Sequence, residues 1–152
     1  MTWTQEQLFA TPQEVTTSDD YYTPKWIFDA LGLHFDLDVA SPPHPTNVPC
    51  ERYYTQQDNG LSSDWYGRVW MNPPFSKPQP WVERWVEHGN GIALLPMAKS
   101  RWFNILWDNP NVSAAPLPSS MKFDQGSIFI ATMLWGIGHD NIRALANFGR
   151  VR

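Results

Sequence analysis

Asn72, Pro73, Pro74 and Phe75 place an amide, two rigid prolines and an aromatic ring directly after an apolar, strand-like run. The Asn72 side-chain oxygen and the Pro73 carbonyl can both accept hydrogen bonds, and the prolines fix their directions without adding a backbone donor. Two acceptors of this kind suit a planar NH2 group, because holding its hydrogens favours the pyramidal nitrogen that can attack an electrophile. The ring of Phe75 offers a face on which a base flipped out of a nucleic acid could stack. We interpret these four residues as a candidate catalytic site.

A second group of residues could hold a cofactor at the start of a helix. Thr23 is a good helix N-cap and Pro24 suits the first helical position, so the stretch "YYTP" predicts a helix start. Free backbone N–H groups and the positive end of the helix dipole would make a seat for the carboxylate of an amino-acid-like cofactor.

A third group lies in the stretch "FDLDVAS", which predicts a buried strand that ends at residues 38–41. Asp38 at the strand end can receive a cofactor ammonium or hydroxyl group. Ala40 and Ser41 are small enough to let a ligand approach the backbone. We expect that Asp36, two residues earlier, could share the role of Asp38.

These residues need elements that bring them together, and the sequence predicts an alternation of strands and helices. The predicted helices cover residues 23–32, 79–89, 99–109 and 140–149, and the predicted strands cover residues 33–41, 52–55, 68–72, 91–97, 111–115 and 127–136. Such an alternation is typical of an α/β fold with a mostly parallel sheet covered on both faces. Ligands bind beyond the carboxyl ends of the strands in these sheets, so Asp38 and Asn72 should face one crevice.

Composition limits the classes of protein that the chain could belong to. Its 152 residues fit one compact domain, which we place at residues 20–152 after a flexible N-terminal arm at residues 1–19. No apolar run approaches membrane-spanning length, and the first twenty residues lack the pattern of a secretion signal. The single cysteine, Cys50, and the absence of zinc-ligand spacing favour a reducing, cytoplasmic protein without a metal.

Five stretches in this order and spacing, "DDYYTP", "FDLDVAS", "DNGLSSDW", "VWMNPPFS" and "ALLPMAKSRWF", resemble the phage-type Dam family of DNA adenine-N6 methyltransferases. The resemblance covers about residues 19–135. It implies an abbreviated Rossmann-like methyltransferase fold, S-adenosylmethionine (SAM) as the cofactor, and no separate target-recognition domain. It also implies duplex DNA as the partner, with the target adenine flipped out of the helix. The stretch "DVASPPHP" has no glycine, so cofactor binding would rest on small residues and backbone groups.

The resemblance assigns roles to individual positions. The catalytic motif would be Asn72, Pro73, Pro74 and Phe75. The cofactor-binding residues would be Tyr22, Thr23, Pro24, Asp38, Ala40, Ser41 and Asp58, the last in a turn beside the adenosine pocket.

Any contact with DNA must rely on local cations, because the chain carries a net charge of −4. Lys77 follows the catalytic motif, and Lys99 and Arg101 follow the stretch "ALLPM". We interpret these three residues either as phosphate contacts or as ordinary solvated surface residues.

Several alternatives remain open from the sequence. The same amino-group chemistry serves cytosine N4, RNA adenine or a protein glutamine, and an inactive methyltransferase-like fold could act as a binding module. The resemblance further suggests a phage or prophage origin, a bacterial cytoplasm as the location, and protection of phage DNA from host restriction.

Overall fold

The structure is a computed structural model that describes residues 23–43, 45–117, 122–123, 126–127, 131–149 and 152. The predicted arm at residues 1–19 and Tyr22 lie outside the described residues. The elements in chain order are α2 (Lys25–Leu31), β1 (Phe35–Asp38), β2 (Cys50–Tyr53), η3 (Gln56–Asp58), η4 (Gly60–Ser62), β3 (Val69–Met71), α3 (Gln79–His88), β4 (Gly91–Pro96), α4 (Arg101–Trp107), β5 (Val112–Pro116), β6 (Lys122–Phe123), β7 (Gly126–Ser127), β8 (Thr132–Ile137), α5 (His139–Leu145) and η5 (Ala146–Phe148).

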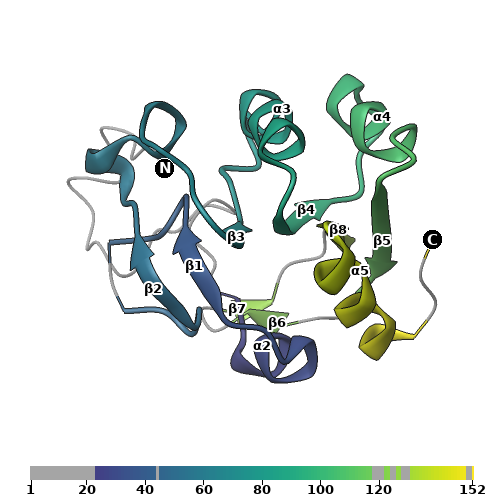
Figure 1. The fold of residues 1–152 in the computed structure, drawn as a ribbon, viewed down its shortest axis with the longest axis horizontal. Coiled ribbons are helices and arrows are strands. Elements are labelled where there is room, and N and C mark those ends of the chain that lie inside the picture. The colour runs from purple at the N-terminus through teal and green to yellow at the C-terminus, as the bar shows by residue number, and fades with distance from the viewer. Residues whose placement is uncertain (1–22, 44, 118–121, 124–125, 128–130, 150–151) are drawn as a thin grey trace.

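Six strands form one sheet in the order β2-β1-β3-β4-β8-β5 (Figure 1). The neighbours from β2 to β4 pair in parallel, whereas β8 runs antiparallel to both β4 and β5. This confirms the predicted mixed α/β architecture with a mostly parallel sheet. The chain passes from β1 outward to β2 on one side, and β3 and β4 follow on the other side. The strand order therefore reverses between β1 and β3, where open α/β sheets bind ligands.

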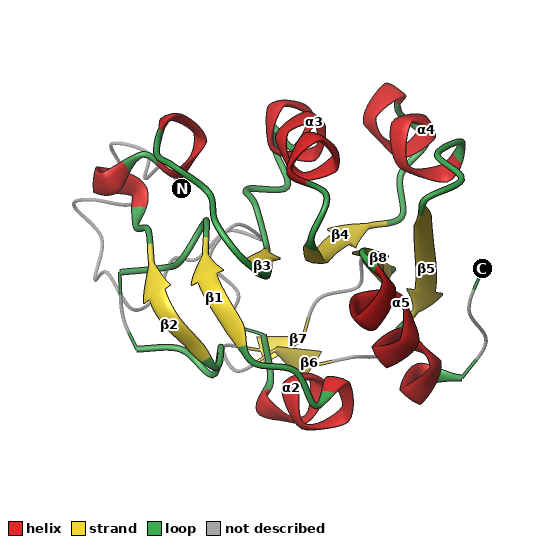
Figure 2. Ribbon diagram, in the orientation of Figure 1, coloured by secondary structure: helices red, strands yellow, loops and turns green. Residues whose placement is uncertain are grey.

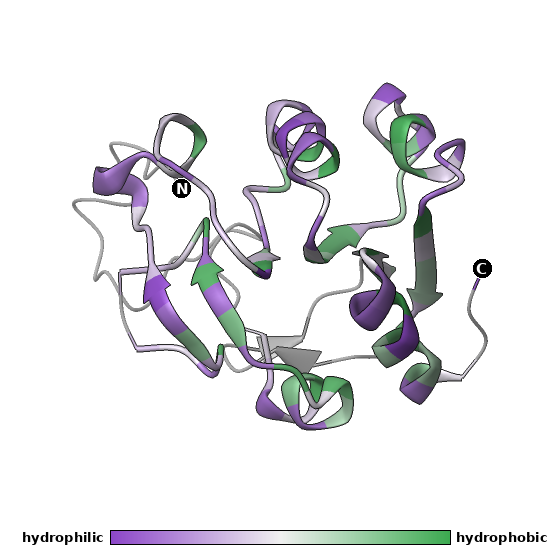
Figure 3. Cartoon of the chain, viewed as in Figure 1, coloured by the Kyte–Doolittle hydropathy of each residue, from purple (hydrophilic) through white to green (hydrophobic). Residues whose placement is uncertain are grey.

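Helices cover both faces of the sheet, with α3 and α4 on one face and α2 and α5 on the other (Figure 2). Strand β3 shows how the side chains divide. Val69 and Met71 pack with Trp85 of α3, whereas Trp70 meets Phe28 of α2 at a ring-centroid distance of 4.7 Å. Burial on both faces explains why the inner strands are continuously apolar. Figure 3 shows the contrast with β2, a largely hydrophilic strand at the edge of the sheet.

Two predicted helix starts are wrong by one or two residues. Thr23 does not cap α2, because Pro24 is still extended (φ −68°, ψ 150°) and the helix begins at Lys25 with no side-chain cap. The hydroxyl of Thr23 bonds instead to Asn72. Asp140 does not cap α5 either, because Gly138 precedes the helix and Asp140 lies in its first turn.

Two strand predictions need correction as well. The strand predicted at residues 127–136 is β8, which begins only at Thr132, opposite Pro96 at the end of β4. Ser127 belongs instead to the small antiparallel pair β6–β7. The strand predicted at residues 52–55 is β2, which ends at Tyr53. None of the described helices has the length and apolar character needed to cross a membrane.

Candidate active site

The carboxyl ends of β1 and β3 are joined by backbone hydrogen bonds that continue past the strands. The N–H of Val39 donates to the carbonyl of Trp70 at 3.1 Å, and the N–H of Tyr54 donates to the carbonyl of Asp38 at 2.8 Å. These bonds hold the ends of three adjacent strands at one height. The residues that follow the strands are therefore fixed by the sheet itself.

A cavity of about 250 Å³ opens beside these strand ends. Its walls come from five segments: Thr23 before α2, residues 38–43 after β1, the η3–η4 turn, Asn72 and Pro74 after β3, and Trp81 of α3. The segments span about sixty residues of sequence. The structure thus brings together three of the groups that the sequence marks as candidate site residues.

Asp38 is the buried carboxylate of the cavity. It is 2% exposed, and its Oδ1 accepts a hydrogen bond from the N–H of Ala40 at 3.1 Å. Burial disfavours the charged form and raises the pKa of Asp38 to about 7, although the Ala40 hydrogen bond lowers it in part. No cation among the described residues forms an ion pair with this carboxylate. A positively charged ligand would therefore be favoured beside Asp38.

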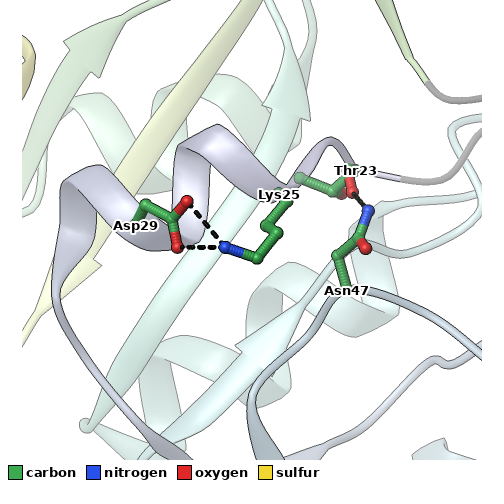
Figure 4. A network of polar contacts seen from close by, with 4 residues as sticks. All are labelled: Thr23, Lys25, Asp29 and Asn47. Atoms are coloured by element: carbon green, nitrogen blue, oxygen red, sulfur yellow. Dashed lines mark hydrogen bonds and ion pairs between the residues drawn. The ribbon is translucent and has the colours of Figure 1, made fainter.

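Asn72 is half-buried, and its side chain bonds across the cavity wall. Its Nδ2 donates to Oγ1 of Thr23 at 3.3 Å. Thr23 is 5% exposed, and its backbone carbonyl accepts a hydrogen bond from Nδ2 of Asn47 at 3.0 Å (Figure 4). Within the described residues, the amide oxygen of Asn72 accepts no hydrogen bond, so it is available to a ligand donor.

The other residues of the predicted catalytic motif surround Asn72 in different ways. Pro74 lines the cavity, and Pro73 is buried behind it. Phe75 is half-buried and lies one residue beyond the lining. The carbonyl of Pro74 accepts a hydrogen bond from the N–H of Lys77 at 3.3 Å, which makes a tight turn of the segment.

The predicted cofactor-binding residues divide into those that line the cavity and those that support it. Ala40 and Ser41 line it together with Thr23 and Asp38, whereas Pro24 is buried beside Thr23. Ser41 is held in place because its N–H donates to the carbonyl of Tyr54 at 2.8 Å.

Two carboxylates from the sequence analysis lie away from the cavity lining. Oδ2 of Asp58 accepts hydrogen bonds from the N–H and the hydroxyl of Thr55, at 2.9 and 3.1 Å. Asp58 thereby shapes the turn whose other residues line the cavity. Oδ2 of Asp36 accepts from the N–H of Arg68 at 2.8 Å, at the amino end of β3, so Asp36 does not share the site of Asp38.

Gly60 and Trp81 line the cavity but were not among the predicted site residues. A Cβ atom on Gly60 would lie 2.0 Å from the carbonyl oxygen of Val39, so only glycine allows the η3–η4 turn to pack on the end of β1. The available signal was the pair Asn59–Gly60, which the sequence analysis interpreted only as a turn.

A cation braces this wall of the cavity from behind. The guanidinium of Arg84 donates to the carbonyl of Leu61 and lies 4.8 Å from the ring centroid of Trp65. The indole N–H of Trp65 donates to the carbonyl of Gly60 at 2.8 Å. The η3–η4 turn is therefore fixed by α3.

The three predicted DNA-contacting cations lie in the segments after β3 and β4. Lys77, Lys99 and Arg101 are all exposed. They follow the carboxyl ends of the strands, as the cavity does. Across the described part of the chain, no group of three or more His, Cys, Asp or Glu side chains could hold a metal ion.

The fold and the cavity define an α/β protein with a small-ligand site at the carboxyl edge of its sheet. A family model described as DNA N-6-adenine-methyltransferase (Dam) matches residues 10–113, more than half of the chain. The chain therefore belongs to the Dam family of DNA N-6-adenine-methyltransferases, as the resemblance predicted.

Two phage proteins illustrate the relationship. The DNA N-6-adenine-methyltransferase of Haemophilus phage HP1 is 34% identical over 98 residues, an alignment that covers 57% of this chain and 56% of that protein. The DNA N-6-adenine-methyltransferase of Escherichia phage T1 is 40% identical over 77 residues, which cover 45% of this chain and 31% of that protein. The chain thus aligns with about half of the first relative and about a third of the second.

Proposed function

We propose that the chain is a SAM-dependent DNA methyltransferase that transfers a methyl group to the N6 amine of adenine. One observation carries the proposal: Asp38 and Asn72, on adjacent strand ends, line the same cavity. Asp38 offers a carboxylate to a cationic cofactor, and Asn72 offers an acceptor to an amine. Membership in the Dam family supports the same reaction.

The proposal includes a Rossmann-like methyltransferase fold over residues 20–152 as a single domain. The sheet supports it, because strands from Phe35 to Ile137 all join one layer and the strand order reverses at the cavity. Only β2 occupies the sheet between β1 and its edge, which fits the abbreviated form implied by the resemblance.

The residues of the cavity fit SAM as the cofactor. Asp38 is buried without a described cationic partner, and the amino-acid part of SAM carries an ammonium group that would supply one. Ala40 and Ser41 leave the backbone accessible beside it, and Thr23 closes the wall opposite. When bound, SAM supplies a methyl group activated by a sulfonium centre.

The protein would act on the amine through hydrogen-bond acceptors. Oδ1 of Asn72 and the carbonyl of Pro73 would accept the two N6 hydrogens of adenine, which favours the pyramidal nitrogen. Phe75 would stack on the flipped base. After methyl transfer the nitrogen must lose one proton, which passes to water or to one of these acceptors.

The substrate in the proposal is duplex DNA with its target adenine flipped out. Lys77, Lys99 and Arg101 would contact phosphates, because they are exposed and follow the same strand ends as the cavity. The phage origin of the two relatives fits a role in protecting phage DNA inside a bacterial cytoplasm.

The test is to incubate the purified protein with methyl-labelled SAM and unmethylated duplex DNA, then to identify labelled nucleosides by mass spectrometry. Labelled N6-methyladenine is the expected product. Labelled N4-methylcytosine, or label only in RNA or protein substrates, would replace adenine in DNA with that substrate. A folded protein that binds no SAM and transfers no label would be a binding module instead.

A further inference from the structure

We infer that Thr23 is a positioning residue for methyl transfer, which orients the Asn72 amide so that its oxygen rather than its nitrogen faces the substrate. The inference rests on the proposed function. It gives Thr23 a role distinct from the cofactor contact that the family resemblance implies. The observation behind it is the hydrogen bond from Nδ2 of Asn72 to Oγ1 of Thr23, 3.3 Å long, between segments 49 residues apart.

The chemistry makes the direction of the amide matter. The two ends of a carboxamide are nearly identical in shape, but one end only accepts hydrogen bonds and the other only donates them. A substrate amine needs an acceptor. An Asn72 amide turned by half a circle would present its own NH2 group to the substrate NH2 group and would repel it.

Thr23 is held firmly enough to select one of the two orientations. Its β-branched side chain has few rotamers, and it is 5% exposed. Its backbone precedes Pro24, which restricts it to extended conformations, and its carbonyl is bound by Asn47 (Figure 4). Asn72 also precedes a proline. Both partners of the hydrogen bond therefore have restricted backbones, and little reorganisation is needed when a substrate arrives.

The wider arrangement explains why the helix start differs from the prediction. A Thr23 hydroxyl that capped α2 could not also fix Asn72. The helix begins at Lys25 without a side-chain cap, and the hydroxyl is used across the cavity wall. The helix gives up a local interaction, and the site gains an oriented acceptor.

The test compares Thr23→Val with Thr23→Ser in single-turnover methyl transfer and in equilibrium SAM binding. Valine keeps the shape but removes the hydroxyl, so the rate constant should fall roughly 3- to 10-fold, the effect of one hydrogen bond. The SAM dissociation constant should stay within about 2-fold. Serine should restore most of the rate. Thr132→Val, which removes a hydroxyl that is 1% exposed in β8 and outside the cavity lining, is the matched control.

A second readout does not depend on turnover. The Asn72 side-chain NH2 signals should show one hydrogen protected from exchange with solvent in the wild type, and this protection should be lost in Thr23→Val. An active wild type with an unchanged rate in Thr23→Val would overturn the inference alone. Parallel losses of rate and SAM affinity would make Thr23 a cofactor contact instead. A wild type that transfers no methyl group would overturn the proposed function and the positioning role together.

Discussion

Two asparagines, Asn72 and Asn141, lie at opposite ends of the parallel strands and use their amides differently. Asn141, 1% exposed, accepts from Nε of Arg68 at 2.7 Å and donates to Asn90 at 2.7 Å and to the carbonyl of Ile137 at 2.8 Å. Both ends of its amide are occupied by protein. Asn72 bonds to Thr23 through its nitrogen, while its oxygen accepts from no described residue.

Two aspartates on β1 repeat this difference within one strand. Asp36 accepts from the N–H of Arg68 beside the closed network, whereas Asp38 is buried against the cavity. Groups at the amino end are satisfied within the protein, and so they stabilise the fold. Groups at the carboxyl end keep part of their hydrogen-bonding capacity for a ligand. The comparison teaches that the same residue types serve stability at one end and chemistry at the other.

Asn72→Ala should produce the largest effect and would break the comparison if it did not. Removing the acceptor should lower the single-turnover rate about 100- to 1000-fold, the loss seen when one preorganised catalytic hydrogen bond is removed. The SAM dissociation constant and the free energy of unfolding should change little. Asn111→Ala, at an exposed loop position, is the control and should remain fully active. Loss of rate and SAM binding together would contradict the role assigned to Asn72.

Asn141→Ala should show the opposite pattern. It leaves Arg68, Asn90 and the Ile137 carbonyl without a partner near the buried amino end. The free energy of unfolding should therefore fall by about 2–4 kcal/mol. Urea denaturation measures this loss. The methyl-transfer rate per folded molecule should stay within about 2-fold of the wild type, and a large fall in that rate would show that the two ends are not separate.

The pH dependence of Asp38 sharpens the comparison. Because the pKa is about 7, raising the pH from 5.5 to 7 should ionise the carboxyl and tighten SAM binding about 10-fold. Asp38→Asn keeps an acceptor for the Ala40 N–H but cannot ionise, so its weaker binding should be flat over this range. Calorimetric titration at several pH values measures the affinities, and equal pH slopes in the two proteins would contradict the role of Asp38.

The same pKa sets the sign of a stability effect in the unligated protein. The pKa of Asp38 is raised above its ordinary value of 3.8, so the protonated carboxyl favours the folded state. This contribution is present below about pH 4 and is lost as the pH rises towards about 7. Asp38→Asn should remove that part of the pH dependence in denaturation curves.

The surface cations should give the smallest effects. Single substitutions Lys77→Ala, Lys99→Ala and Arg101→Ala should each weaken DNA binding about 2- to 5-fold at low salt and reduce the salt dependence by about one charge. Arg143→Ala, an exposed cation on α5, is the matched control. Effects that are equal for Arg143 and the other three would show that no particular surface contacts DNA.

The sequence was sufficient for features that depend on local pattern. Apolar runs predicted the inner strands, and the proline after Asn72 marked the end of β3 correctly. Because parallel strands share a carboxyl edge, the sequence also predicted that Asp38 and Asn72 would meet. The antiparallel insertion of β8 was not predicted, since an apolar strand carries no signal for its direction.

The rest depended on contacts between distant segments. The pairing of Thr23 with Asn72 displaced a cap that local propensity favoured. The need for glycine at residue 60 comes from the carbonyl of Val39, some twenty residues away. Asp58 and Asp36 looked like ligands by type but are bound by Thr55 and Arg68. Residue type alone cannot show whether a polar group is satisfied.

The most direct test of the central claim is a crystal structure of the protein with S-adenosylhomocysteine, the demethylated form of the cofactor. We predict that the ligand occupies the cavity between β1 and β3, with its ammonium group beside Asp38 and its sulfur towards Asn72. A ligand bound elsewhere, with this cavity empty, would contradict the claim that the open end of the sheet is the active site.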